Sequence, residues 1–565
     1  MADARRVALL CIDPWLKKEG SYRPFNYSVR RIEAAIRAEP EFDSLDLRVF
    51  DTQSADPDAL FAELERFDPD VIGASAYVWS FPTFLEVSRR ARARRPDVTS
   101  IFGGPSARPE MFALAPFAPY ADDVDALVLG EGERTIQDIL RLPDRSRDSL
   151  STLPGLSISN GSSFVATAHA EPPPLEGLAS PFQMDLVPHG FTGHLETFRG
   201  CPLSCSFCQW GDLSNASRTF SKEYLVRELE AFGRMEARGV TLVDAALNLN
   251  PRAFRNLVQA EEDVRFLRSV HFHTEVYPSH MTPEHLRFLE TIEADSVGIG
   301  LQSYDPEVLK RVERNFYADR FERTVRDVGS IVPDTVVEII LGLPGDNPDS
   351  FRRTLEQARR LPVGVRVYKC LVLPNALMSR APAHFAMEYD PRTLQMISCW
   401  GWSREELERA CEELTELVKT DGGEILDGSD TWKFPSFAEA ERRRVRHPAA
   451  LSLRPDLQAL LARELGAASD LTWALREARY GGERLVLSTE TPEGALDIEI
   501  RSAQNGRPGF RTRAGIAFSY VPPPNRTPGR ATLAVLERVA DRLGPILRKS
   551  EGLPFSEPHR LPLVR

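Results

Sequence analysis

Three cysteines lie close together in this chain: Cys201, Cys205 and Cys208, in the run Arg-Gly-Cys-Pro-Leu-Ser-Cys-Ser-Phe-Cys-Gln-Trp-Gly. Thiolates this close on one segment favour a shared metal centre, and cysteine thiolates are the usual ligands of iron–sulfur clusters. The next cysteine along the chain is Cys370, so a cubane held by these three has one iron open to a small ligand. A structural zinc loop is the alternative, but structural zinc prefers four ligands in two spaced pairs. The spacing therefore predicts a catalytic 4Fe-4S cluster.

The elements around the cysteines alternate between strand and helix patterns. Six strands are expected between residues 193 and 375, at 194–198, 240–244, 270–275, 296–299, 336–341 and 367–373. The cysteine loop follows the first of them. Chemistry in parallel α/β barrels takes place at the carboxyl ends of the strands, so the residues that follow these strands are the candidates for a site.

The first 140 residues show the same alternation, which is typical of a doubly wound parallel sheet. Two of the expected strands end in glycine-containing turns, Gly103-Gly104-Pro105 and Gly130-Glu131-Gly132-Glu133. Glycines at the carboxyl ends of parallel strands let a large ligand approach the backbone. A nucleotide-binding domain is one alternative, although no G-x-G-x-x-G follows the first strand. A receiver-like domain without a ligand is the other.

The cysteine spacing, with Phe207 just before the third cysteine, resembles that of the radical S-adenosylmethionine (SAM) enzymes. The N-terminal sheet resembles the cobalamin-binding domain that precedes the radical SAM core in one subfamily. Together the resemblance covers roughly residues 5–420. Residues 143–190 are rich in Pro, Ser and Gly and predict a linker with a short hairpin. Beyond residue 376 the resemblance thins, and the pattern predicts a helix at 405–419 that begins with a capping box of Ser403 and Glu406, helices at 456–465 and 530–549, and strands at 485–489 and 496–501. We expect residues 377–565 to form a small α+β region over the barrel mouth. The resemblance implies an α/β chain with a Rossmann-like cobalamin domain at 1–142 and a partial (β/α)6 barrel at 191–376. It also implies three cofactors, namely a 4Fe-4S cluster, SAM and cobalamin in its methylcobalamin form.

Short motifs after the barrel strands carry the resemblance further. The segment from Gly298 to Ser303 matches the family's G-x-Q-S element, and Leu341 to Gly345 matches its G-L-P-G turn. The family's Gly-Gly-Glu segment is absent, because the second strand ends in Asp-Ala-Ala-Leu-Asn-Leu-Asn. The resemblance implies a SAM site made of Phe207, Asn248, Glu275, Gly300, Gln302, Ser303, Gly342 and Leu373. It also makes Glu275 and Tyr304 the candidates for catalysis.

The cobalamin site implied by the resemblance lies at the strand ends of the N-terminal domain. It comprises Asp13, Ser75, Tyr77, Trp79, Gly103, Gly104, Pro105, Gly130, Glu131 and Gly132. Many cobalamin domains carry a D-x-H-x-x-G motif whose histidine ligates cobalt. The first histidine here is His169, so residues 1–168 cannot supply that ligand. Trp79 could instead cover the lower face of the corrin, or it could be a core tryptophan.

Composition narrows the class of partner. The formal charge is −12 and no dense basic run is present, which argues against a nucleic-acid substrate. No apolar stretch reaches the length of a membrane span or a signal peptide, so we expect a cytoplasmic protein without a membrane partner. Seven cysteines, three of them in one loop, suit a reducing compartment.

The family implies a cobalamin-dependent radical SAM methyltransferase. In such enzymes one SAM methylates cobalamin, methylcobalamin gives the methyl group to a carbon, and a second SAM supplies the 5′-deoxyadenosyl radical. The methyl acceptor would be an unactivated or aromatic carbon of an amino acid, a peptide or a small natural-product intermediate. A protein of the flavodoxin or ferredoxin type would supply the electrons. A cyclase, rearrangement or oxidation enzyme without net methyl transfer is the alternative.

Overall fold

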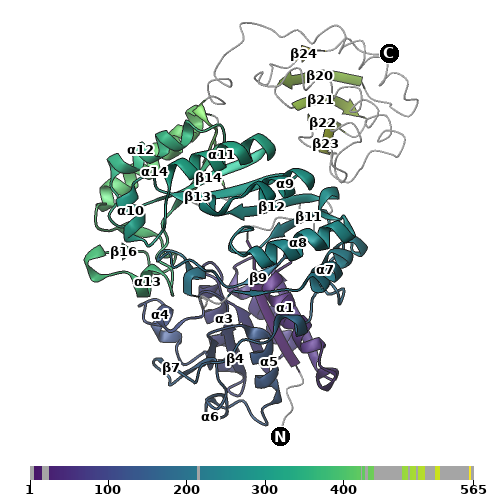
Figure 1. The fold of residues 1–565 in the computed structure, drawn as a ribbon. Helices are drawn as coiled ribbons and strands as arrows, with labels where there is room; N and C mark the ends of the chain where they lie inside the picture. The colour runs from purple at the N-terminus through teal and green to yellow at the C-terminus, as the bar shows by residue number, and fades with distance from the viewer. Residues whose placement is uncertain are drawn as a thin grey trace.

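The computed structural model describes residues 6–14, 25–212, 217–421, 423–426 and 430–437, together with the backbone of five further strands between 474 and 560. Figure 1 shows an N-terminal α/β domain, coloured purple to blue, beside a second α/β domain coloured teal to green. The short strand β9 (Phe198–Arg199), which leads into the cysteine loop, lies between them.

The N-terminal domain is built on a seven-stranded sheet in the order β2-β1-β3-β4-β5-β6-β7. The first five strands are parallel: β1 (Arg6–Ile12), β2 (Asp46–Thr52), β3 (Val71–Ser75), β4 (Thr99–Gly103) and β5 (Ala126–Val128). Because β2 and β3 lie on opposite sides of β1, the chain changes winding direction there. In doubly wound sheets ligands bind beyond the strand ends at this point.

Both faces of this sheet are covered by helices, as the continuous apolar run of β1 predicts. Val7 and Leu9 pack against α1 (Tyr27–Arg37) and α5 (Gly132–Arg141). Ala8 and Leu10 face the core shared with α2 (Pro57–Phe67) and α3 (Phe81–Arg94) on the other side. Two shorter helices, α4 (Pro109–Phe112) and α6 (Arg147–Leu150), complete the domain.

The segment expected as a linker contributes to the sheet. Its strands β6 (Leu156–Ser159) and β7 (Phe164–Ala166) form an antiparallel hairpin that extends the sheet from β5. Leu156 and Ile158 are buried there with residues of β4, β5 and α5. Burial of these two side chains joins the hairpin to the domain, a contact that its Pro- and Ser-rich surroundings do not indicate.

The second domain contains the six expected parallel strands. Its sheet runs β18-β19-β15-β14-β13-β12-β11-β8, with β8 to β15 parallel and the last two antiparallel. The strands are β8 (Thr192–Leu195), β11 (Gly239–Leu242), β12 (His271–Val276), β13 (Ser296–Gln302), β14 (Asp334–Leu341), β15 (Gly364–Lys369), β18 (Glu424–Ile425) and β19 (Thr431–Phe434). The prediction of a partial barrel after a doubly wound domain is therefore confirmed.

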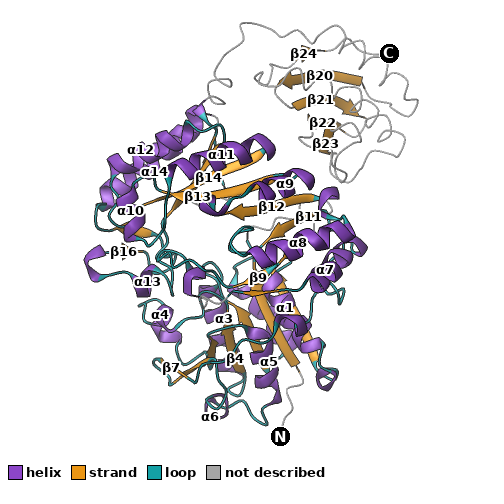
Figure 2. Ribbon diagram, viewed as in Figure 1, coloured by secondary structure: helices purple, strands orange, loops and turns teal. Residues whose placement is uncertain are grey.

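Helices cover the outer face of this curved sheet (Figure 2). They are α7 (Lys222–Arg234), α8 (Pro251–Val264), α9 (Pro283–Thr291), α10 (Pro306–Arg311), α11 (Ala318–Ile331), α12 (Pro348–Arg359) and α14 (Arg404–Asp421). Strand β12 shows the resulting alternation, since Phe272, Thr274 and Val276 are buried while His273 and Glu275 are half-buried. The half-buried positions face the interior of the barrel.

After the barrel, the chain returns to the N-terminal domain before α14 begins. Leu394 is buried in the core of that domain, and Leu373 and Met378 of the turn and helix α13 (Leu377–Arg380) pack against it. The capping box expected before α14 is present: the Ser403 N–H donates to Glu406 at 2.9 Å, and the Glu406 N–H donates to Ser403 at 3.3 Å.

The last strands form a separate antiparallel sheet in the order β23-β22-β21-β20-β24. Its members are β20 (Ala474–Gly481), β21 (Arg484–Thr491), β22 (Gly494–Ser502), β23 (Ile516–Val521) and β24 (His559–Arg560). The strand pair expected at 485–489 and 496–501 corresponds to β21 and β22. The helices expected at 456–465 and 530–549 lie outside the described residues. Within the part of the chain that is described, no helix is long and apolar enough to cross a membrane.

Candidate functional site

The cysteine loop begins where β9 ends. Gly200 takes a positive φ of 99°, a conformation that favours glycine, and turns the chain into Cys201. Cys201 and Cys205 are buried, and Cys208 is half-buried. The Cys208 N–H donates to the Cys205 carbonyl at 3.1 Å, so both lie on one turn. Among the described residues no group of three His, Cys, Asp or Glu side chains is arranged so that it could hold a metal ion, so the structure does not gather the three thiols around one point. Three thiols carried by one loop fit the chemistry of a cluster with an open iron.

A buried carboxyl group fixes the strand that leads into this loop. Asp244, just after β11, accepts hydrogen bonds from the Thr197 N–H at 2.8 Å, the Phe198 N–H at 3.3 Å and the Thr197 hydroxyl. Burial raises the pKa of Asp244 to about 7, although these donors act in the opposite direction. Where the family has Gly-Gly-Glu, this chain therefore has a carboxyl that holds β9 in place.

Two arginines that the sequence reasoning did not single out hold the cysteine loop from the barrel side. Arg314 lies with a guanidinium nitrogen 4.0 Å from the Cys205 sulfur and donates to the Gly300 carbonyl. Arg380 of α13 donates to the carbonyls of Cys205, at 3.1 Å, and Cys208. Burial raises the pKa of the Cys201 thiol, and Arg314 lowers it. Positive charge at this position suits thiolates, the form that ligates iron.

The barrel interior carries a second polar group of residues. Glu338 accepts from Arg366 at 3.0 Å and from the Tyr368 hydroxyl at 2.9 Å. Glu275 faces the same space, and burial and then Glu338 raise its pKa to about 8, while Arg366 lowers it. A Cβ on Gly298 would lie 2.2 Å from the Glu275 carboxylate oxygens, so a side chain there would displace the Glu275 carboxylate from its present position. Only Glu275 was expected here, although charged residues inside the apolar runs of β14 and β15 are a signal that could have found Glu338 and Arg366.

Several expected SAM residues do lie between the cysteine loop and the barrel. A Cβ on Gly300 would lie 2.9 Å from a guanidinium nitrogen of Arg314, so a side chain there would displace the end of that arginine. Gln302 has a positive φ of 69°, and its buried Oε1 has no hydrogen-bond partner among the described residues. Phe207 packs against the barrel core. Gly342 also has a positive φ, of 86°, and turns the chain beneath α14.

Other expected residues are engaged elsewhere. Asn248 exchanges two 2.8 Å hydrogen bonds with the backbone of Tyr277, so its amide joins two barrel loops. Ser303 is fully buried and accepts from the Asp305 N–H at 3.1 Å, next to the start of α10. The ring of Tyr304 packs edge-on against Phe316 and against α11 residue Phe321, in a cavity between α11 and α12. Tyr304 therefore lies in the helix layer, and the structure does not bring it to the barrel interior.

Residues at the carboxyl edge of β1 and β3 gather at the switch point of the N-terminal sheet. The Trp79 indole N–H donates to the Ile12 carbonyl at 2.7 Å, and its ring stacks on Tyr77 at 4.6 Å. Asp13 accepts from Asn26 at 2.7 Å, and burial raises its pKa. Trp79 is half-buried at this edge, a position compatible with covering a flat ligand.

The glycine turns expected to meet the corrin differ from one another. Gly104 has a positive φ of 94°, and a Cβ there would lie 2.8 Å from the Ala76 carbonyl. Around Gly130 no described atom lies within 4 Å of the Cβ position, so this turn leaves open space. Gly132 permits close packing of α5 on Ile32. The Pro105 backbone carbonyl accepts a hydrogen bond from the Gln209 side chain. The backbone carbonyl of Leu373, one of the predicted SAM residues, accepts a hydrogen bond from the Ala376 N–H.

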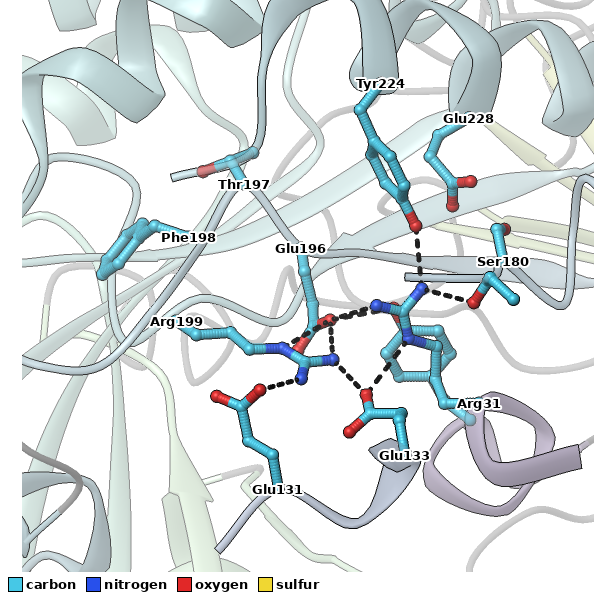
Figure 3. A network of polar contacts seen from close by, with 12 residues as sticks. Arg31, Glu131, Glu133, Ser180, Glu196, Thr197, Phe198, Arg199, Tyr224 and Glu228 are labelled. Atoms are coloured by element: carbon cyan, nitrogen blue, oxygen red, sulfur yellow. Dashed lines mark hydrogen bonds and ion pairs between the residues drawn. The ribbon is translucent and has the colours of Figure 1, made fainter. Parts of the chain in front are cut away.

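Glu131 has a role that the sequence reasoning did not predict. Its carboxylate pairs with Arg199 at 2.8 Å (Figure 3). It also pairs with Arg218, and both arginines come from the second domain. The Glu131 side chain therefore joins the two domains, and its assignment to the corrin stays a prediction. The remaining members of the expected set, Ser75 and Gly103, lie at the ends of β3 and β4 on the same edge.

Comparison with known proteins agrees with this geometry. Residues 24–140 match the B12 binding domain model, and residues 195–358 match that of the Radical SAM superfamily. The chain thus contains a B12-binding domain followed by a radical SAM domain. The three expected cofactors, a 4Fe-4S cluster, SAM and cobalamin, are thereby confirmed.

Two curated relatives of this chain are methyltransferases, and others are tRNA-2-methylthio-N(6)-dimethylallyladenosine synthases. The chain is 30% identical over 336 residues to 2-(S-pantetheinyl)-carbapenam-3-carboxylate methyltransferase of Streptantibioticus cattleyicolor, a match that covers 55% of this chain and 48% of that one. It is 28% identical over 335 residues to the cobalamin-dependent radical SAM methyltransferase TokK of Streptomyces tokunonensis, again over 55% and 48%. The matches thus span about half the length of these relatives.

Solved structures share the fold. OxsB, a cobalamin-dependent SAM radical enzyme with aqua-cobalamin and SAM bound, superposes with a TM-score of 0.54 at 15% identity over 83% of this chain and 73% of that one. The radical SAM methyltransferase TsrM of Kitasatospora setae, with tryptophan and a SAM analogue bound, gives 0.51 at 17% identity over 66% and 75%.

Proposed function

We propose that this protein methylates a carbon atom of a small natural-product intermediate, using cobalamin and radical SAM chemistry. The observation that carries the proposal is that the cysteine loop lies against the carboxyl edge of the B12-binding sheet. Gln209, next to Cys208, donates to the Pro105 carbonyl at 3.0 Å, and Arg199, two residues before Cys201, pairs with Glu131 at 2.8 Å. A cluster and a corrin bound at these places share one reaction space.

The chain's own residues divide the work in this space. When bound, the cluster supplies the electron that cleaves SAM, and cobalamin carries the methyl group. Cys201, Cys205 and Cys208 would hold the cluster, while Arg314 and Arg380 would fix its loop. The edge around Trp79 and Gly130 would hold the corrin and exclude water from it.

The barrel interior is the place we assign to the substrate. Because the pKa of Glu275 is raised to about 8, its carboxyl holds a proton at neutral pH and can release it when a cationic group approaches. Arg366 supplies a guanidinium to the same space, and this group can orient a substrate carboxylate. The carboxylate in the name of the Streptantibioticus relative's substrate supports a small acidic molecule. The chain's acidic balance gives no support to a nucleic-acid substrate.

Isotope-labelled SAM tests the proposal. Reduced, reconstituted protein with SAM bearing a deuterated methyl group should form S-adenosylhomocysteine in an amount matching the bound cobalt, even without substrate. With the carbapenam carboxylate of the relative, we expect a deuterated methyl group in the product together with 5′-deoxyadenosine. A product that loses hydrogens and gains no deuterated methyl group would replace methylation by cyclisation or oxidation. Deuterated product without 5′-deoxyadenosine would indicate polar methyl transfer.

A further inference from the structure

The boundary between the two domains buries a network of charged side chains beside the cysteine loop (Figure 3). The network comprises three carboxylates and three guanidinium groups: Glu131, Glu133, Glu196, Arg31, Arg199 and Arg218. The side chain of Arg31 is 3% exposed, that of Glu133 8% and that of Arg199 14%. Arg31, Glu131 and Glu133 come from the B12-binding domain, and the other three come from the radical SAM domain.

Arg199 is the centre of this network. Its two terminal nitrogens contact Glu131 at 2.8 Å, Glu133 at 2.7 Å and Glu196 at 3.0 Å. The first two carboxylates belong to the turn that follows β5 and to the first turn of α5. Only Gly200 separates Arg199 from Cys201. The near end of the cysteine loop is therefore docked on one of the two glycine turns of the B12-binding sheet.

The far end of the cysteine loop is docked on the other turn. Gln209 directly follows Cys208, and its side-chain amide donates to the Pro105 carbonyl and to the Pro374 carbonyl, both at 3.0 Å. Pro105 follows β4, and Pro374 lies in the turn after β15. One uncharged amide thus joins the cysteine loop, the B12-binding domain and the end of the barrel.

Stability alone does not explain a buried network of this kind. A buried ion pair is often no more stabilising than well-packed apolar residues of similar volume, and its best-attested use is to specify one geometry. Apolar contacts already join the two domains, since Leu394, Leu373 and Met378 pack in the core of the B12-binding domain. The charged and amide contacts add directional constraints at the two ends of the cysteine loop.

We propose that Arg199 and Gln209 are positioning residues that set the separation between the cluster and the cobalamin. They dock the two ends of the cysteine loop on the turns after β5 and β4, to which we assign the corrin. This inference rests on the proposed function only in that both cofactors serve one reaction space. Neither residue touches a cofactor in this account, because each acts through the backbone that it holds.

Two variants and a matched control test the proposal. Arg199→Lys keeps the charge but cannot contact three carboxylates with a planar fork. Gln209→Leu removes the amide without adding or removing a charge. Arg359→Lys is the control, because Arg359 forms an even more deeply buried pair with Asp421 at 2.6 Å between α12 and α14, within the helix layer. A general effect of weakening a buried arginine pair would appear in the control as well.

The measurement is magnetic rather than catalytic. The holoprotein is reconstituted with cluster and cob(II)alamin, and the microwave power that half-saturates the Co(II) electron paramagnetic resonance signal is compared with the cluster oxidised and reduced. A nearby reduced cluster speeds the relaxation of Co(II), with a steep dependence on distance. We expect this enhancement in the parent protein and in Arg359→Lys, and its partial loss in Arg199→Lys and Gln209→Leu at unchanged iron and cobalt contents.

Full enhancement in both variants with both cofactors bound would overturn the proposal. So would a parent protein that shows no enhancement, because its cofactors would then be too far apart to be positioned by these contacts. If only Arg199→Lys fails to bind both cofactors, the relaxation of Co(II) in Gln209→Leu decides the test. If both variants lose a cofactor while the control keeps both, the two residues serve to retain the cofactors and do not set their separation. Absence of methyl transfer with normal enhancement would refute the proposed function and leave this inference standing.

Discussion

Substitutions of Asp244 should separate the effect of its charge on stability from the effect of its hydrogen bonds. Its pKa, raised by burial from 3.8 to about 7, makes the folded state bind a proton that the unfolded state has already released. As the pH rises from about 4 to about 7 the free energy of unfolding therefore falls, and the loss stays constant above pH 7. The difference between the two pKa values corresponds to about 4 kcal/mol at 1.36 kcal/mol per unit.

Asp244→Asn removes this penalty and keeps the shape. Its amide oxygen can still accept from the N–H groups of Thr197 and Phe198, while its amide nitrogen donates to the Thr197 hydroxyl. We expect the melting temperature of the variant, relative to the parent, to rise between pH 5 and pH 8. The change in this difference should be about 6–12 °C, because about 3 kcal/mol of the penalty develops over that interval and each kcal/mol shifts a domain of this size by about 2–4 °C.

Asp244→Ala should behave in the opposite way. It leaves two buried N–H groups without an acceptor, at about 1–3 kcal/mol each, so melting should occur earlier at every pH. Circular dichroism of anaerobic protein at one fixed heating rate measures both variants. The reasoning is refuted if the difference between Asp244→Asn and the parent is the same at pH 5 and pH 8, since Asp244 would then not titrate in that interval.

Three further variants probe the cofactor loops. Gly104→Ala places a Cβ 2.8 Å from the Ala76 carbonyl at a positive φ, so we expect this variant to retain less cobalamin at unchanged iron content. The control Gly177→Ala, whose Cβ meets no described atom within 4 Å, should retain both cofactors. Equal cobalt contents in the two variants would count against the assignment of the Gly104 turn to the corrin. Arg380→Gln should release iron to a chelator faster than the control Arg392→Gln at an exposed site, because it loses the contacts to the Cys205 and Cys208 carbonyls. Equal release rates would show that these contacts do not protect the cluster. Trp79→Ala should change the Co(II) spectrum while the iron content is kept. Earlier melting with an unchanged spectrum would make Trp79 a packing residue, since the loss of a fully buried ring costs about 3–5 kcal/mol and that of a half-buried ring less.

Local sequence signals were sufficient for most of the fold. The continuous apolar run of β1 indicates a strand covered on both faces, and Ser403 with Glu406 marks the start of α14. A short hairpin was predicted within residues 143–190, but its addition to the sheet beside β5, with burial of Leu156 and Ile158, was not. Nothing in their local pattern shows which surface they cover.

The site residues that lie in one sequence segment could be predicted from the sequence. The roles of residues at the boundary between the domains were much less predictable. The cysteine loop is a local motif, and Glu275 follows a recognisable strand. The roles of Glu131 and Asn248 are different, because each depends on a partner that folding alone brings near: Arg199 for the carboxylate, and the Tyr277 backbone for the amide. The sequence shows that a polar residue follows a strand, but it does not show which side chain or backbone group that residue will bind in the folded protein.

Metal analysis after anaerobic reconstitution tests the central claim, that the cysteine loop holds a cluster beside a cobalamin at the domain boundary. The parent protein should contain about four irons, the content of one cubane, with cobalt at the level of the protein and both corrin and iron–sulfur absorbance. The triple variant with Cys201, Cys205 and Cys208 replaced by Ala should lose the iron and keep the cobalt. Iron retained by the triple variant, or a parent protein that binds no cobalamin, would contradict the account.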